Sequence, residues 1–82
     1  MTQIKTIKEL KKLCKGKYAD LFIVLNYGLR SSKSIYWDED TGQFEVFHSI
    51  DGSIESLTEI QLMNPNRTNI GKAMKQGALF SG

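Results

Sequence analysis

The N-terminal part of the chain spaces its apolar residues with the period of a helix. One face collects the apolar positions, which are Ile7, Leu10, Leu13 and Cys14. Lysines occupy the opposite face, and this 3.6-residue spacing is typical of an amphipathic helix. Thr6 and Glu9 match a capping box at its start, and Gly16 suits its end. The pattern predicts a helix over about residues 7–15.

A short, mostly apolar run follows at residues 19–26, with the sequence ADLFIVLN. Its length and its β-branched and aromatic residues favour a buried central strand over a helix. After a turn near Gly28, the segment 33–37 predicts a second strand that ends at Trp37. The stretch GLRSSKSIYW is therefore expected to connect one strand to the next.

The third predicted strand is QFEVFHSI, residues 43–50. The positions expected on one of its sides are Phe44, Val46, His48 and Ile50. The loop 38–42 before it is so short that the second and third strands must be antiparallel neighbours. If Phe47 points outward instead, it becomes an exposed apolar residue and a candidate contact.

The last third of the chain predicts two short helices after a turn at Asp51-Gly52. Thr58 and Gln61 match a second capping box, and Pro65 ends that helix. The final helix covers about residues 70–76. Its expected caps are Thr68 or Asn69 at the start and Gly77 at the end. Residues 78–80 are then expected to pack back on the sheet.

Together these elements predict a single small α+β domain over residues 1–82. Their order is α-β-β-β-α-α: an N-terminal helix, a three-stranded antiparallel β-meander and two short C-terminal helices. A sheet of this size needs cover on one face, and the three helices can supply it.

Composition excludes several classes of protein. The single cysteine excludes an intramolecular disulfide, and with one histidine the chain lacks the four ligands of a structural zinc site. The longest apolar run, residues 21–25, is far shorter than a membrane span. We therefore expect a cytoplasmic protein without a membrane, metal or cofactor partner.

Charge is weak in total but divided along the chain. Residues 1–37 carry a balance of +6, residues 38–59 one of −7 and residues 60–82 one of +3, for a net charge of +2. A net charge this small gives no strong long-range attraction to nucleic acid. Separate patches of opposite sign can nevertheless meet a complementary protein surface.

The sequence comes close to two ligand-binding motifs but matches neither of them. The stretch from Gly28 lacks the second glycine of a P-loop, and it leads into a strand where a P-loop needs a helix. In the acidic loop 38–42, Gly42 comes one position early for an EF-hand, and Ser49 stands where a bidentate glutamate is required. Neither a P-loop nor an EF-hand is therefore predicted.

Basic and hydroxyl residues of the first half form the candidate binding set. They are Lys8, Lys11, Lys12, Lys15, Arg30, Ser31, Ser32 and Lys33. Residues 30–33 can hold a phosphate or a carboxylate through charge-assisted hydrogen bonds. Tyr27 and Tyr36 are possible aromatic contacts that can stack on unpaired bases. The alternative interpretation is a solvated hairpin loop beside core aromatics.

Residues suited to catalysis are few. His48 needs a nucleophile or a carboxylate at hydrogen-bond distance, and Cys14 lies on an apolar helix face, where thiols are usually inert. We therefore expect a small non-enzymatic binding or regulatory module that acts through a protein partner or as a homo-oligomer. The alternative function is nucleic-acid binding through the lysine face of the first helix and the loop 30–33.

Overall fold

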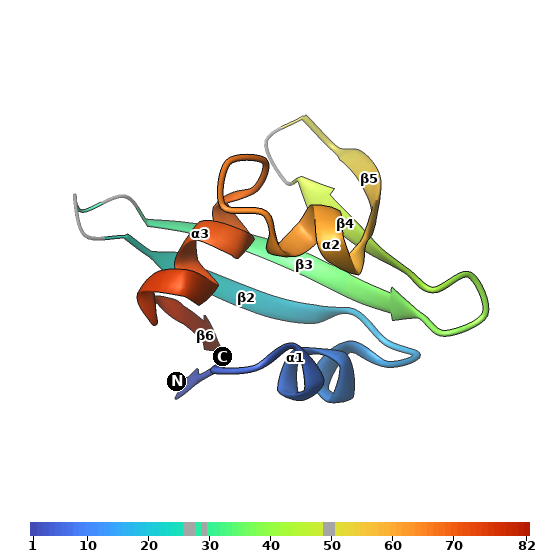
Figure 1. The fold of residues 1–82 in the computed structure, drawn as a ribbon, viewed down its shortest axis with the longest axis horizontal. Helices are drawn as coiled ribbons and strands as arrows, with labels where there is room; N and C mark the ends of the chain where they lie inside the picture. The colour runs from blue at the N-terminus through green and yellow to red at the C-terminus, as the bar shows by residue number, and fades with distance from the viewer. Residues whose placement is uncertain (26–27, 29, 49–50) are drawn as a thin grey trace.

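The described part of the chain forms a six-stranded antiparallel sheet and three short helices (Figure 1). The computed structural model describes residues 1–25, 28, 30–48 and 51–82, and of Arg30 it describes the backbone alone. The described elements in chain order are β1 (Thr2–Gln3), α1 (Ile7–Cys14), β2 (Ala19–Val24), β3 (Arg30–Asp38), β4 (Gln43–His48), β5 (Ser53–Thr58), α2 (Glu59–Met63), α3 (Asn69–Gln76) and β6 (Leu79–Ser81).

The prediction of a three-stranded meander was wrong. The strand order is β1-β6-β2-β3-β4-β5, so the predicted meander β2-β3-β4 is extended by β5 on one side and by β6 and β1 on the other. The predicted second strand is also longer than expected, because β3 begins at Arg30. Tyr27 and Ile50, which the sequence placed in a turn and in the third strand, lie outside the described residues.

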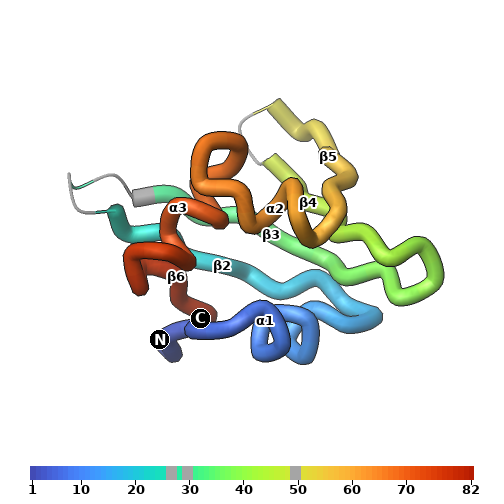
Figure 2. Tube along the Cα trace, in the orientation of Figure 1, coloured from blue at the N-terminus to red at the C-terminus, as the bar shows by residue number. Residues whose placement is uncertain are grey.

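The missed strands lack the sequence pattern of a half-buried strand. In β5, Ile54 and Leu57 stand three positions apart and therefore face opposite sides of the sheet. Glu55 occupies an inward position, where an apolar residue would have completed the alternation. β1 and β6 span two and three residues, too few to show any period. They pair near the two ends of the chain, with Thr2 opposite Ser81 (Figure 2).

The helices lie where the sequence predicted them. Thr6 caps α1, and its hydroxyl accepts a hydrogen bond from the Glu9 amide at 3.2 Å. Thr58 and Gln61 form the complete reciprocal capping box of α2. Gly77 ends α3 in the left-handed conformation, with φ of 69°. None of the described helices is long and apolar enough to cross a membrane.

One face of the sheet holds the hydrophobic core, and the helices cover this face (Figure 1). The buried strand residues alternate along each strand and are Leu21, Ile23, Ile35, Phe44, Val46, Leu57 and Leu79. Leu10 and Cys14 of α1, Leu62 of α2 and Ile70 of α3 pack against them. The side chains between these positions point to the opposite face, which we call the open sheet face.

Candidate functional site

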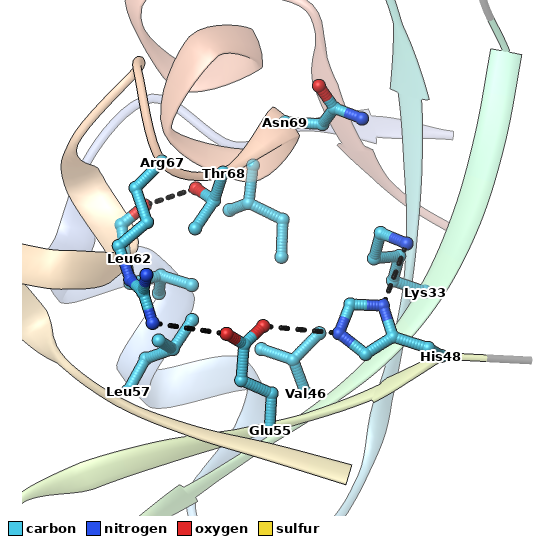
Figure 3. Close-up of a pocket in the computed structure, with 10 residues that line it drawn as sticks. Lys33, Val46, His48, Glu55, Leu57, Leu62, Arg67, Thr68 and Asn69 are labelled. Carbon is cyan, nitrogen blue, oxygen red and sulfur yellow. Dashed lines mark hydrogen bonds and ion pairs between the residues drawn. The ribbon is translucent and has the colours of Figure 1, made fainter. Parts of the chain in front are cut away.

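A pocket of about 180 Å³ opens where β3, β4 and β5 meet the start of α3 (Figure 3). Its floor is apolar and consists of Val46, Leu57, Leu62 and Ile70. Four ionisable side chains stand around this floor: Lys33, His48, Glu55 and Arg67. Charged groups above an apolar base are the arrangement of a small-ligand site.

Strand register brings three of the four charged groups together. Glu55 of β5 is paired with Val46 of β4, two residues before His48. Residues two apart on a strand point to the same side, so Glu55 and His48 are diagonal neighbours on the helix-covered face. Lys33 reaches the same place from β3, on the other side of β4.

A continuous chain of polar contacts joins the four side chains (Figure 3). Lys33 Nζ lies 3.2 Å from His48 Nδ1, and His48 Nε2 lies 3.3 Å from Glu55 Oε1. The second carboxylate oxygen of Glu55 accepts a hydrogen bond from Arg67 at 3.1 Å. These partners assign the tautomer: Nε2–H donates to the carboxylate, and Nδ1 accepts from the ammonium group.

The charges along this series of polar contacts do not balance. Glu55 is shared between Arg67 and His48, so its negative charge is already engaged. Among the residues that the structure describes, no carboxylate lies within ion-pair distance of Lys33. Lys33 therefore brings an uncompensated positive charge to the pocket, with two of its three N–H donors free for a ligand.

The upper wall of the pocket is held by the turn before α3. Thr68 donates a hydrogen bond from its hydroxyl to the Leu62 carbonyl at 2.6 Å and accepts one from the Gly71 amide at 2.8 Å. Asn69, the first residue of α3, lies at the rim. The hydroxyl of Thr68 thus ties the end of α2 to the start of α3 and fixes this wall.

The lysines of α1 lie apart from this pocket. Lys11 forms an ion pair with Glu59 and stands 4.6 Å from the Trp37 ring centre, and Lys15 pairs with Glu39 at 3.3 Å. Lys8 and Lys12 are exposed. α1 meets β3 at Trp37, four residues from Lys33, which is about 13 Å along a strand.

Strand alternation divides the predicted RSSK cluster between the two sheet faces. Ser31 and Lys33 stand on the helix-covered side, whereas Ser32 stands on the open sheet face. Tyr36 is also on the open sheet face, with its ring 5.3 Å from that of Tyr18. The backbone of Arg30 is paired with Val24 at the start of β3.

Cys14 and His48, the pair considered for catalysis, have different surroundings. The thiol of Cys14 is fully buried and donates a hydrogen bond to the Leu10 carbonyl at 3.0 Å. Burial raises the pKa of this thiol to about 11, so it carries no thiolate at neutral pH. The described partners of His48 are Lys33 and Glu55.

Sequence reasoning identified Lys33 and the inward side of His48 but missed Glu55 and Arg67. Arg67 reaches Glu55 across twelve residues of chain, and no periodic pattern links two such positions.

Among the described residues, no group of three or more His, Cys, Asp or Glu side chains is placed to hold a metal ion. The chain matches no family model, no curated protein and no solved structure, so its own residues have to carry the interpretation.

Proposed function

We propose that the protein is a small binding module whose pocket holds a short-chain carboxylic acid. The observation that carries this proposal is the ammonium group of Lys33 at the edge of an apolar floor, where no carboxylate of the described residues pairs with it. An ammonium group with free donors forms charge-assisted hydrogen bonds to a carboxylate. The floor beside it suits a short hydrocarbon chain.

Charge supports a ligand with one negative charge. With His48 neutral, the two cations and the one carboxylate leave the pocket at +1, so a monoanion would neutralise it. The ligand carboxylate would contact the ammonium group of Lys33. Glu55 would repel a ligand that carries negative charge at both ends.

Pocket size supports a small ligand. The pocket has a volume of about 180 Å³. The pocket is smaller than the roughly 300–1,000 Å³ of sites for drug-sized ligands. Four- to six-carbon acids therefore fit this space better than nucleotides or sugars.

Titration of the ¹⁵N-labelled protein, followed by NMR, tests the proposal. Butyrate is expected to shift the amides around the pocket and to bind about tenfold more tightly than acetate, because two more methylene groups leave water. Butylamine and butanol, which lack the carboxylate, are the matched controls. Inorganic phosphate tests whether negative charge alone is enough.

Lys33→Met is expected to abolish the butyrate response, and Lys75→Met is the control because Lys75 is an exposed lysine of α3. Shifts that are equal for acetate and butyrate would contradict an apolar contact. If no acid shifts the amides around the pocket, the proposal is wrong, and the polar contacts from Lys33 to Arg67 have a structural role only.

A further inference from the structure

His48 stands between a cation and a carboxylate in the pocket (Figure 3). Its Nδ1 atom lies 3.2 Å from Lys33 Nζ, and its Nε2 atom lies 3.3 Å from Glu55 Oε1. An imidazole ring bears a proton on both nitrogens only in its cationic form, so Nδ1 accepts a hydrogen bond from Lys33 only while His48 is neutral. The contact between Lys33 and His48 therefore depends on the protonation state of the ring.

Protonation of His48 changes this contact from a hydrogen bond to a repulsion. Nδ1 and Lys33 Nζ are then both donors on positively charged groups, placed 3.2 Å apart. A like charge this close disfavours the cationic form of the ring. The free pocket therefore opposes a proton at Nδ1 as long as the ammonium group of Lys33 stays in place.

An anion at Lys33 reverses this effect. Because Nζ and Nδ1 are neighbours that both line the pocket, a carboxylate in contact with the ammonium group also lies close to Nδ1. Its negative charge favours a proton on the ring, and a carboxylate oxygen can accept a hydrogen bond from Nδ1–H. The charge of the four ionisable side chains of the pocket rises from +1 to +2 when His48 takes up this proton.

We infer that anion binding in this pocket is coupled to proton uptake at Nδ1 of His48, so that affinity rises as pH falls through the titration range of histidine. The inference rests on the proposed function, because it concerns the regulation of the same site. Free histidine titrates at about pH 6.5, which is close to physiological pH. The protein thus holds its acid more tightly in a mildly acidic setting and releases it as pH rises.

The remaining charged groups around His48 do not replace this anion. Glu55 of β5 faces Nε2, and it is shared with Arg67 of the turn before α3. Asp51 follows β4 in an exposed turn, and its pKa is lowered mainly by hydrogen bonds from Ser53 and to a lesser extent by His48. Among the described side chains, no carboxylate is hydrogen-bonded to Nδ1, so a bound anion supplies an interaction that the protein itself lacks there.

Titration of the whole chain with butyrate at pH 8 and at pH 6, at constant ionic strength, tests the inference. Aliphatic carboxyl groups titrate at about pH 4–5, so butyrate is ionised at both values. Affinity is expected to be about fivefold higher at pH 6, at the lower end of the usual range for coupled binding events, because His48 is partly exposed. His48→Gln cannot take up the proton and should bind butyrate equally at both pH values, whereas the control Lys75→Met should keep the rise.

The ¹⁵N chemical shift of Nδ1 gives an independent measurement on the unaltered chain. His48 is the only histidine, so its ring signals belong to no other residue. Near pH 7, butyrate should move the Nδ1 resonance from the range of an unprotonated nitrogen toward that of a protonated one. Butanol, which lacks the charge, should leave this resonance in place.

Sulfate, which is a dianion at both pH values, separates this inference from the proposed function. If sulfate binds more tightly at pH 6 through His48 and butyrate does not bind, the proton coupling stands and the proposed ligand is wrong. Butyrate affinity that is equal at pH 8 and pH 6, or a rise that persists in His48→Gln, would overturn the coupling and leave the carboxylate site intact. If neither anion binds at either pH, both are wrong.

Discussion

Gly71→Ala is expected to destabilise the protein, although alanine is the better helix former. Gly71 is the third residue of α3, at the point where this helix touches the end of α2. A Cβ atom there would lie 2.7 Å from the Leu62 carbonyl oxygen and 2.8 and 2.9 Å from the carbonyl carbons of Met63 and Asn64. All three are backbone atoms, which cannot rotate away.

The magnitude follows from two opposing effects. Replacing glycine in a helix by alanine stabilises by about 0.5–1 kcal/mol. Relief of the contact requires α3 to move about 0.7 Å away from α2, and overpacking of this kind costs about 1–3 kcal/mol. The net loss is expected to be about 1–2 kcal/mol, or a fall in Tm of about 5–15 °C for a domain of this size.

Urea unfolding followed by circular dichroism measures this loss. Lys75→Ala, at an exposed position of the same helix, is the control and should change the free energy of unfolding by less than about 0.5 kcal/mol. Because α3 forms the upper wall of the pocket, Gly71→Ala should also weaken butyrate binding. A variant as stable as the parent chain would refute the argument that close helix contact requires glycine at this position.

Two further predictions concern pH. The thiol of Cys14 should react slowly with iodoacetamide at pH 8 in the folded protein and rapidly in denaturant. Because its pKa rises from 9.0 to about 11 on folding, its contribution to stability is lost as pH rises through this interval. Cys14→Ala should remove the part of the pH-dependent stability loss that this thiol causes. The Ser53 hydroxyl, 2.6 Å from the Asp51 carboxylate, is the main cause of the lowered pKa of Asp51, so Ser53→Ala should raise this pKa toward 3.8 in an NMR titration. The Asp51 contribution to stability is present above pH 3.8 and lost as pH falls through the lowered pKa; an unchanged pKa in Ser53→Ala would contradict this assignment.

Two of the four charged residues of the pocket stood out in the sequence, but no sequence pattern brought them together in one pocket. Lys33 stood out because it belongs to a small cationic cluster, and His48 because it shares the alternation of Phe44 and Val46. No sequence pattern singled out Glu55 or Arg67. Their roles depend on β5 pairing with β4 and on the turn before α3, which bring distant residues within hydrogen-bond distance.

The sequence by itself determined the local structure. Caps, glycines and helical spacing involve residues a few positions apart, so Thr6, Thr58 and Gly77 could be read as helix ends without knowledge of the fold. The central strands could also be predicted, because a short and dense apolar run such as 19–26 indicates a buried strand.

Only the tertiary structure decided the size of the sheet and which charges meet. β1, β5 and β6 carry weak patterns of their own and exist because β2 and β4 offer them edges to pair with. The same pairing sets the faces: it turns Lys33 and Glu55 toward the pocket and Phe47 and Ile54 toward the open sheet face. Strand register is a contact between segments distant in sequence, so its consequences appear only once the chain has folded.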